Sequence, residues 1–392
     1  MSQQLISRNP DLKRLRDDGY DVAERANYLV MARVPYVNSK KEILYGTLVS
    51  ELSLNGDVTI APKTHVVHFV GEYPCDHNGA PLERIRNQSQ TQNLGGGLVI
   101  QHSFSSKPNG GYKDYHEKMT TYIKIISNQA RAIDPSVTAT PFPAIHADAD
   151  DSVFEYLDTA TSRAGIGAMN EKLAADRVGI VGLGGTGGYV LDLVAKTPVA
   201  EIHLFDGDRF SQHNAFRAPG AASLQDLRDA PQKVNYLRAQ YVRMRRQIFA
   251  HDCFVDASNV GLLHALTFVF LCMDDGEAKR PIVAELETKG IAFVDVGMGL
   301  ERVDEKLYGI VRVTTSTPAK RDHVHQKQRI PFVGGGTNEY SNNIHIADLN
   351  AVNAAQAVIK WKKLRGFYGD LEREHFSTYT IDGNTLLNED HA

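Results

Sequence analysis

One stretch, residues 177–208, constrains the fold of this chain more than any other. It reads RVGIVGLGGTGGYVLDLVAKTPVAEIHLFDGD: an apolar β-branched run, a glycine-rich turn, a helical pattern, a second apolar run and two aspartates. Glycines between a strand and a helix permit a tight turn with positive φ and let backbone N–H groups approach phosphate oxygens. The stretch therefore predicts a nucleotide-binding βαβ unit.

Strand and helix patterns alternate over the rest of residues 146–392. Strands are predicted at Arg177–Gly182, Glu201–Phe205, Ala250–Val255, Thr267–Cys272, Ile291–Val296 and Lys306–Thr315, and helices at Gly187–Ala195, Pro231–Gln247, Ala278–Lys289 and about Ile346–Arg365. This rhythm is typical of a mainly parallel sheet with helices on both faces. The sequence thus predicts an α/β, Rossmann-like domain over residues 146–392.

Residues 1–145 have a different pattern. Apolar runs at Tyr28–Val37, Glu42–Leu52, Thr64–Cys75 and Gly97–Phe104 are separated by turn-rich pieces, and a helical pattern follows at Tyr112–Ala132. Such runs predict a mostly antiparallel sheet closed by a helix. The acidic, proline-punctuated segment at 134–151 is typical of a linker. We therefore expect a smaller α+β domain at 1–145.

The composition excludes several classes of protein. The 392 residues are 42% hydrophobic and 23% charged, with a formal net charge of −4, so no basic field indicates nucleic acid or an anionic membrane as partner. The amino-terminal residues lack the apolar core of a secretory signal, and no segment approaches a membrane span. The 3 cysteines form no disulfide framework and no CxxC pair. We expect a cytoplasmic protein without structural zinc.

Acidic, amide and cationic residues follow the second predicted strand. They are Asp206 and Asp208 in DGD, Asn214 and Arg217 in NAFR, and Lys233 in PQKV. The glycine turn alone also fits a nicotinamide-dependent dehydrogenase, but hydride transfer has no need of these cations. An enzyme that attacks the α-phosphate of a nucleotide does need them, because its transition state and departing pyrophosphate concentrate negative charge.

The motifs, in their order, resemble those of the ThiF/MoeB superfamily, the adenylating fold of ubiquitin-activating enzymes. The resemblance runs from Arg163 to about Gly366 and rests on GLGGTG, DGD, NAFR, PQKV and CMDDGEAKR, the last with Asp275 and Arg280. It implies ATP and Mg²⁺ as ligands. It also implies attack by a carboxylate on the α-phosphate of ATP, which yields an acyl-adenylate and pyrophosphate.

The resemblance assigns a role to each motif. The glycine turn, with Gly182, Gly184, Gly185 and Gly187, would lie against the adenosine and the phosphates, Asp206 would hold the ribose, and Asn214, Arg217 and Lys233 would contact the triphosphate. Asp275 would position magnesium or the reacting phosphate, since a hard cation prefers carboxylate oxygen. Asp208 would orient the NAFR loop, with a helix cap or turn acid as the alternative.

Arg163 precedes the first strand of the Rossmann-like domain. Dimeric members of the family supply an arginine at this place to the ATP of the partner subunit, so the resemblance implies a homodimer with Arg163 acting in trans. A surface arginine at a helix start is the alternative.

The implied substrate is the C-terminal glycine carboxylate of a ubiquitin-like or sulfur-carrier protein. The extra domain at 1–145 is similar in arrangement to proteins of bacterial operons for ubiquitin-like conjugation, some linked to antiphage defence. It would recruit the carrier or a conjugating enzyme. Two alternatives stay open: adenylation of a small-molecule, peptide or tRNA-linked carboxylate by the same fold, and a catalytically silent scaffold.

The cysteines depart from the pattern of ubiquitin-activating enzymes, which form a thioester on a cysteine beyond the nucleotide site. This chain has no cysteine after Cys272, and both Cys253 and Cys272 lie in apolar runs, where a thiol is usually inert packing. Cys75 stands between a strand and a turn, so an exposed thiol is an alternative to a packed strand-end cysteine. Its neighbours Glu72 and Asp76 would raise its pKa, and we predict no thioester on this chain by itself.

The polar loop Ser316–Asn343 matches in position the crossover loop that arches over a carrier's tail in this family. We expect it to be mobile and to face the substrate. His323 and His325 alternate within it, but without a third ligand they predict no metal site.

Overall fold

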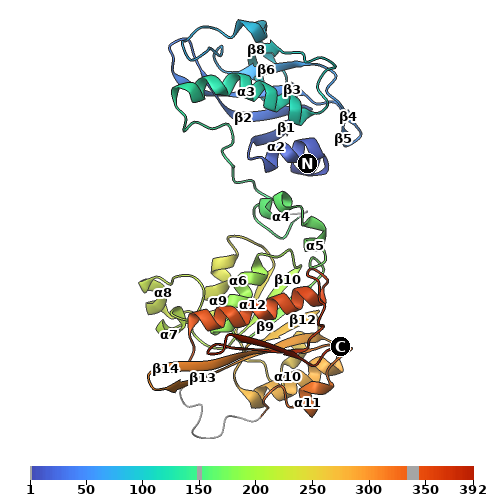
Figure 1. The fold of residues 1–392 in the computed structure, drawn as a ribbon, viewed down its shortest axis with the longest axis vertical. Coiled ribbons are helices and arrows are strands. Elements are labelled where there is room, and N and C mark those ends of the chain that lie inside the picture. Colours follow the sequence, from blue (N-terminus) through green and yellow to red (C-terminus); the bar gives the residue numbers. More distant parts are fainter. Residues whose placement is uncertain (1, 148–151, 333–343) are drawn as a thin grey trace. The chain divides into compact units, whose positions relative to one another are not determined.

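The structure is a computed structural model that describes residues 2–147, 152–332 and 344–392 (Figure 1). Contacts within the chain divide it into two compact units, 1–148 and 149–392. Each unit has hydrophobic clusters of its own, and each is described by itself.

The amino-terminal unit is built on a six-stranded sheet in the order β1-β2-β3-β6-β8-β7, with antiparallel neighbours throughout. The strands are β1 (Asp21–Arg25), β2 (Tyr28–Val37), β3 (Ile43–Glu51), β6 (Val66–Val70), β7 (Arg86–Asn93) and β8 (Val99–Ser105). A two-stranded ribbon, β4 (Leu54–Asn55) and β5 (Val58–Thr59), and a short 3₁₀ helix, η1 (Glu83–Ile85), complete the β part.

Three helices bury their apolar sides against this sheet: α1 (Ser2–Arg8), α2 (Pro10–Asp17) and α3 (Tyr115–Ile133). The side chain of Asp114 caps α3 by accepting a hydrogen bond from the N–H of Glu117 at 2.7 Å. Tyr115, Met119 and Tyr122 recur at helical spacing and are fully buried in the main cluster. The helix predicted at Tyr112–Ala132 is thus present as α3.

The carboxyl-terminal unit contains an eight-stranded sheet in the order β11-β10-β9-β12-β13-β14-β15-β16. The strands are β9 (Arg177–Val181), β10 (Glu201–Phe205), β11 (Ile248–His251), β12 (Phe268–Leu271), β13 (Ala292–Val303), β14 (Lys306–Ser316), β15 (Phe376–Thr380) and β16 (Thr385–Glu389). Pairing is parallel from β11 to β13 and antiparallel from β13 to β16. The prediction of a Rossmann-like α/β domain preceded by a smaller α+β domain is confirmed.

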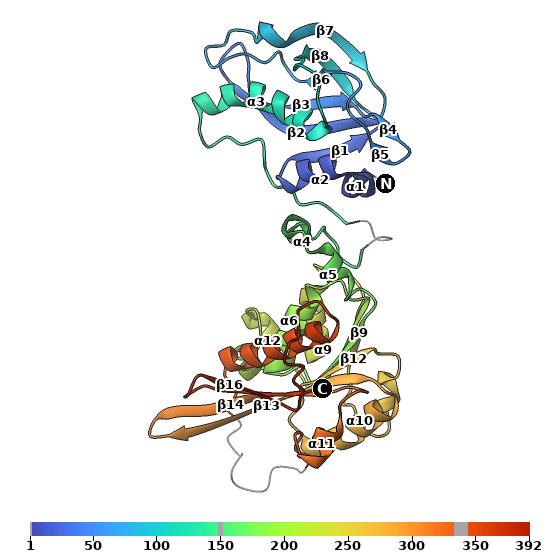
Figure 2. The same ribbon diagram turned by 45° about the vertical axis from the view of Figure 1, so that its right-hand side comes forward.

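Helices cover both faces of this sheet. The helices of this unit are α4 (Thr159–Ala164), α5 (Gly167–Glu171), α6 (Gly185–Ala195), α7 (Gln212–Ala215), α8 (Leu224–Asp229), α9 (Lys233–Tyr241), η2 (Val260–Leu263), α10 (Gly276–Thr288), α11 (Asp322–Gln326) and α12 (Ala347–Leu364). Of these, α4, α5 and α8 have no buried residue. One hydrophobic cluster unites α6, α9 and α12 with the sheet, and a second unites η2, α10 and α11 with it. Figures 1 and 2 show α10 and α11 on the side of the sheet opposite α6 and α12.

Several predicted bounds differ from the structure. The strand predicted at Ala250–Val255 is β11, Ile248–His251, and the strand predicted at Ile291–Val296 continues to Val303 in β13. The helix predicted at Pro231–Gln247 ends at Tyr241, and Arg245 lies buried beyond it, where its guanidinium donates to the carbonyls of Thr197 and Val199. The polar loop Ser316–Asn343 contains helix α11, so its first part is ordered. Its residues 333–343 lie outside the described ranges.

The single tryptophan of the chain, Trp361, links α12 to the sheet. Its side chain is fully buried, and Nε1 donates to Oδ2 of Asp176 at 2.9 Å. Nε of Arg365 donates to the same oxygen at 2.6 Å, and Oγ1 of Thr267 donates to Oδ1 at 2.8 Å. Asp176 therefore joins α12 to the starts of β9 and β12.

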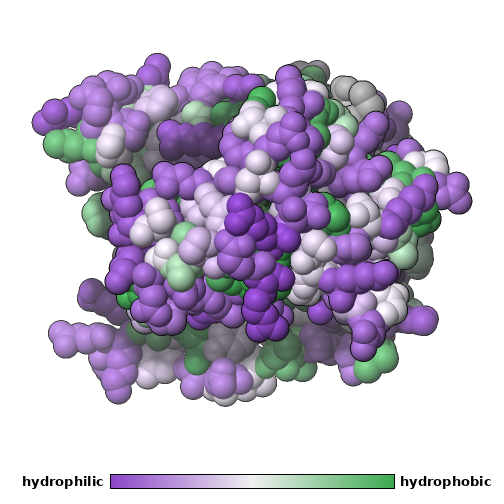
Figure 3. All heavy atoms as spheres, turned by 90° about the horizontal axis from the view of Figure 1, so that it is seen from above, coloured by the Kyte–Doolittle hydropathy of each residue, from purple (hydrophilic) through white to green (hydrophobic). Residues whose placement is uncertain are grey.

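The helices described here include none with the length and apolar character that crossing a membrane requires. Figure 3 shows hydrophilic residues over most of the face in view, with apolar residues in smaller areas between them.

Candidate functional site

The glycine turn and the acidic pair Asp274–Asp275 lie beside each other, each at the carboxyl end of a strand in the middle of the sheet. β9 and β12 are adjacent and parallel, so the segments that follow their carboxyl ends lie beside each other. β9 also pairs with β10 on its other side, so the strand order reverses at β9. In open α/β sheets, ligands bind in the crevice outside such a switch point.

Close approach of backbone requires glycine at two places in the turn. Gly182 has a φ of +87°, and a Cβ on it would lie 2.9 Å from the carbonyl of Cys272. A Cβ on Gly187 would lie 1.9 Å from the carbonyl oxygen of Gly182. A Cβ on Gly185 would collide with the side chain of Asn350, which packs α12 against α6. Gly184 differs, because a Cβ there meets nothing within 4 Å, so this part of the turn faces open space.

Asp206 follows β10 and fixes the turn through its carboxylate. Oδ2 accepts from the N–H of Leu183 at 2.7 Å, and Oδ1 accepts from the N–H of Asp208 at 2.9 Å. The side chain is largely buried. Asp206 thus links the glycine turn to the segment after β10.

Lys233 at the start of α9 lies over the two aspartates. Its Nζ is 2.6 Å from Oδ2 of Asp208 and 3.5 Å from Oδ1 of Asp206. The N–H of Lys233 also donates to the carbonyl of Asp208 at 2.9 Å. The structure therefore brings Asp206, Asp208 and Lys233 together, although the last is far along the chain.

Two polar atoms in the NAFR segment lack partners. Oδ1 of Asn214 accepts from the N–H of Ser211 at 2.9 Å within the capping box of α7. Nδ2 of Asn214 and Nε of Arg217 are buried, yet neither has a hydrogen-bond partner among the described residues. Buried donors without acceptors are costly, so a bound ligand with acceptor oxygens would satisfy both.

Asp275 is the N-cap of α10. Its Oδ1 accepts from the N–H groups of Glu277 at 3.0 Å and Ala278 at 3.1 Å. The side chain is exposed at the end of β12. Arg280, one turn further, places its guanidinium over the ring of Phe332 and donates to the carbonyl of that residue at 3.3 Å.

Two family models match the chain. The ThiF family matches residues 159–340, and a family described as a domain of unknown function (DUF6791) matches residues 10–159. The carboxyl-terminal half of the chain carries a ThiF family domain.

One curated relative and several solved structures are similar to parts of the chain. A ubiquitin-like modifier-activating enzyme 5 from Culex quinquefasciatus is 25% identical over 150 residues, which are 36% of this chain and 38% of that protein. The match therefore spans well under half the length of that relative. MccB of E. coli with succinimide is 15% identical, covers 59% of this chain and 67% of its own, and has a TM-score of 0.44. PaaA is 16% identical, covers 57% and 75%, and has a TM-score of 0.45.

A buried ion cluster links helix α10 to strands β13 and β14. Asp295 on β13 is fully buried, and its two oxygens lie 2.6 Å from Nζ of Lys279 and 2.7 Å from a guanidinium nitrogen of Arg312. Both cations are needed, because a buried carboxylate without partners is strongly destabilising. The cluster fixes the helix whose first residues follow Asp275. The sequence analysis did not predict this ion cluster, although the aspartate inside the apolar run AFVDV indicates a buried carboxylate that needs a cationic partner.

His345 is a second residue that sequence reasoning missed. It precedes α12, and its Nδ1 is buried without a partner among the described residues. Burial lowers the pKa of His345, and the charge of Arg217 lowers it further, whereas Asp274 opposes the shift. His345 therefore lies near the NAFR arginine as a neutral imidazole. A lone histidine before a helix gives no signal in the sequence.

Arg163 is exposed on α4, a helix that contacts α5. The hydrogen bonds that join Asp206, Asp208 and Lys233 do not involve it. Its action on the ATP of a partner subunit stays a prediction.

The possibility of an exposed Cys75 is wrong. Its side chain is only 2% exposed, and its N–H donates to the carbonyl of Val37 at 2.7 Å, which ties the residue to β2. Burial raises the pKa of the Cys75 thiol, and Asp76 and Glu72 raise it further. Burial also raises the pKa of Cys253 and Cys272. No described thiol has the low pKa of a reactive cysteine.

The histidines of the polar loop engage other partners. His323 is buried, and Nε2 of His325 lies 2.8 Å from Oε2 of Glu287. Within the described ranges, no three His, Cys, Asp or Glu residues are grouped so as to hold a metal ion by themselves.

Proposed function

We propose that the ThiF domain activates a carboxylate by adenylating it with ATP. The observation that supports the proposal is the pair of buried donors, Nδ2 of Asn214 and Nε of Arg217, which have no hydrogen-bond partner among the described residues. A nicotinamide dinucleotide would not require cations at this position, whereas a triphosphate supplies the acceptor oxygens that these donors lack.

The residues around the turn fit ATP. Gly184 leaves space for phosphate oxygens to approach the backbone at the start of α6. Asp206 lies beneath the turn, where it would receive the ribose. Asn214, Arg217 and Lys233 would bind the phosphates, and Lys233 would then exchange part of its contact with Asp208 for phosphate oxygen.

Asp275 would hold Mg²⁺ together with phosphate oxygens. Both of its cap bonds use Oδ1, and no described residue donates a hydrogen bond to Oδ2. The ion would neutralise charge on the phosphates. Phosphate oxygens and water would supply the other ligands of the ion.

The reaction needs no proton transfer. A carboxylate oxygen of the substrate attacks the α-phosphorus and forms a new P–O bond, while the bond from the α-phosphorus to the bridging oxygen of the β-phosphate breaks. Pyrophosphate leaves with the electron pair of that bond. Arg217 and Lys233 stabilise the charge that develops on the leaving group.

We propose that the carboxylate is the C-terminal glycine of a ubiquitin-like or sulfur-carrier protein. The likeness to a ubiquitin-like modifier-activating enzyme supports this substrate over a free amino acid. The amino-terminal unit would recruit the carrier or a conjugating enzyme, and the setting would be a cytoplasmic bacterial conjugation pathway, with antiphage defence as one role.

Exchange of labelled pyrophosphate into ATP tests the proposal. We expect exchange only when a purified carrier protein with a C-terminal glycine is present, and none when that glycine is removed. Exchange with free amino acids or short peptides and none with a carrier would favour the small-substrate alternative. If the chain binds ATP but no carboxylate supports exchange, the alternative of a catalytically silent scaffold is favoured.

A further inference from the structure

Helices α6 and α12 both begin at the edge of the carboxyl-terminal sheet that carries the glycine turn. Near the start of α12, Oδ1 of Asn350 accepts a hydrogen bond at 2.8 Å from Oγ1 of Thr186, which lies in the first turn of α6. Near the other end of α12, Trp361 donates to Asp176, which directly precedes β9. Because α6 follows the carboxyl end of β9, the two helices run in the same direction. The positive ends of two helix dipoles therefore lie at the carboxyl ends of the strands.

The N-cap residue of α12 does not cap the helix. This residue, Ile346, has an apolar side chain, and its carbonyl accepts the first intrahelical hydrogen bond, from the N–H of Asn350 at 3.0 Å. The N–H groups of the residues between them have no acceptor within the helix. The first turn of α12 can therefore donate to an anion.

The NAFR segment adds buried donors beside α6. A Cβ on Gly188 of α6 would lie 3.0 Å from Cδ of Pro219, which follows Arg217 by two residues. Asn214 is only 3% exposed, yet its Nδ2 has no hydrogen-bond partner in the part of the chain that the structure describes. The same holds for the buried Nε of Arg217. Both donors require acceptor oxygens that a ligand can supply.

His345 relates the start of α12 to the NAFR segment. It stands two residues before the helix, and its Nδ1 is buried without a partner among the described residues. Burial lowers the pKa of His345, the charge of Arg217 lowers it further, and Asp274 opposes both effects. The imidazole is therefore neutral and close to Arg217. In the tautomer that carries its proton on Nδ1, it is a further donor toward the same place.

We propose that His345 and the first turn of α12 bind the pyrophosphate portion of ATP together with Arg217. Nδ1–H of His345 and the N–H groups of the helix start would donate to phosphate oxygens that Asn214 and Arg217 also contact. The departing pyrophosphate would then be held by donors from two elements that lie far apart in the sequence. The proposal rests on ATP as the nucleotide proposed above and adds to its site a residue outside the sequence motifs.

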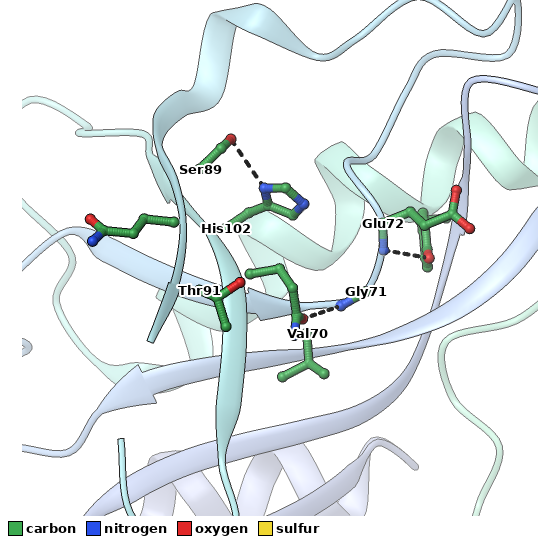
Figure 4. Close-up of a pocket in the computed structure, with 9 residues that line it drawn as sticks. Val70, Gly71, Glu72, Ser89, Thr91 and His102 are labelled. Atoms are coloured by element: carbon green, nitrogen blue, oxygen red, sulfur yellow. Dashed lines mark hydrogen bonds between the residues drawn. The ribbon is translucent and has the colours of Figure 1, made fainter. Parts of the chain in front are cut away.

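The amino-terminal unit provides a matched histidine for the test. A pocket of about 690 Å³ lies beside β7, and His102 lines it with Nδ1 at 3.1 Å from Oγ of Ser89 (Figure 4). Burial lowers the pKa of His102, and the charge of Arg86 lowers it further, as burial and an arginine do for His345. The acidic Glu72 lines the same pocket, which therefore does not favour phosphate. His102→Ala is the control variant.

Calorimetric titration of the full chain with ATP and Mg²⁺, and with AMP, tests the subsite. His345→Ala should weaken ATP binding about tenfold, which is typical of losing a hydrogen bond to a charged group, and should change AMP binding by no more than about twofold. His345→Asn keeps an amide donor close to the position of Nδ1, so its affinity for ATP should stay within about threefold of the wild-type value. His102→Ala should leave the affinities for both nucleotides unchanged.

A gain of affinity gives a second test that misfolding cannot imitate. Asp348 is the acid in the first turn of α12, and it is exposed. Its charge would repel a phosphate bound at this helix start, so Asp348→Asn should strengthen ATP binding about twofold. The same substitution should not strengthen binding of AMP.

The outcomes separate this subsite from the proposed function. If the wild-type chain binds ATP and His345→Ala binds it as tightly as His102→Ala does, the subsite is overturned while ATP remains the ligand. Equal weakening of ATP and AMP binding in His345→Ala would also overturn it, because the histidine would then support the fold and not the pyrophosphate. No ATP binding by the wild-type chain would overturn the subsite and the adenylation together.

Discussion

Lys233 and Asp208 form a salt bridge of 2.6 Å between the start of α9 and the segment after β10, and they differ sharply in exposure. The lysine side chain is 7% exposed, whereas that of the aspartate is 56% exposed. The buried partner is therefore the cation, and its second contact is the buried Asp206 at 3.5 Å. Lys233 is therefore held in place by both aspartates.

Lys233→Met should abolish activity, whereas Asp208→Asn should not. Loss of the lysine removes a cation from the developing pyrophosphate, so we expect pyrophosphate exchange to fall by on the order of 100-fold or more. Asp208→Asn keeps a hydrogen-bonding oxygen toward Lys233, so we expect a loss of about tenfold or less. Equal losses in the two variants would make Asp208 as important as the cation and would exclude its role as a simple turn acid.

Asp275 caps α10, and substitution separates this role from the one proposed for it at Mg²⁺. Asp275→Asn keeps the oxygen that caps α10 but removes the charge that would hold Mg²⁺, so exchange should be lost at unchanged thermal stability. Asp275→Ala removes the cap as well, and its free energy of unfolding should fall by about 1 kcal/mol. Full exchange activity of Asp275→Asn would remove the metal-positioning role.

Arg163 is tested by mixing two inactive proteins. If Arg163 reaches the ATP of a partner subunit, Arg163→Ala mixed with Asp275→Asn should regain part of the exchange activity, because one site of each mixed dimer is then complete. Light scattering on the wild-type chain measures whether the dimer exists. A monomer, or full activity of Arg163→Ala alone, would contradict this role.

His375 should make the carboxyl-terminal unit sensitive to acid. Burial lowers the pKa of His375 to about 4, against about 6.5 for histidine in an unfolded chain. Between these values the unfolded state binds a proton that the folded state does not, so the free energy of unfolding falls as the pH falls. We expect a loss on the order of 1–3 kcal/mol between about pH 6.5 and 4.

Urea unfolding at several pH values measures this loss. His375→Gln should flatten the acid slope, although it lowers stability at pH 7 by removing the bonds to Arg373 and Thr317. His264→Gln changes an exposed histidine paired with Glu285 and is the control. An unchanged slope in His375→Gln would assign the acid sensitivity to other groups.

Cys75 should be unreactive and dispensable for adenylation. Because the thiol is buried and its pKa is raised, iodoacetamide should modify it slowly in the folded chain and rapidly in urea. Cys75→Ala should leave exchange unchanged. A reducing-agent-sensitive carrier adduct that disappears in Cys75→Ala would instead make the amino-terminal unit a catalytic partner.

Sequence reasoning predicted the elements whose residues repeat regularly. Glu201–Phe205 is a strand with the predicted bounds, because β-branched and apolar residues in a buried run fit only the middle of a sheet. β7 was missed, because its polar residues show no alternation and its strand state depends on pairing with β8.

The residues of the candidate site could be predicted only where they belong to one short segment of the sequence. The glycine turn and DGD lie in one βαβ unit, so spacing alone relates them. The contacts of Asp295 with Lys279 and Arg312, and the position of His345 near Arg217, depend on elements that meet only in the folded chain. The burial of Cys75 likewise depends on β2, which lies far from it in the sequence.

Trp361 makes the two units optically distinct. As the one indole of the chain, buried and hydrogen-bonded to Asp176, it belongs to the carboxyl-terminal unit alone. Its emission should shift to the red when that unit unfolds, while unfolding of the amino-terminal unit leaves it unchanged. Selective excitation of tryptophan in the intact protein therefore follows the unfolding of the carboxyl-terminal unit alone, without cutting the chain or adding a label.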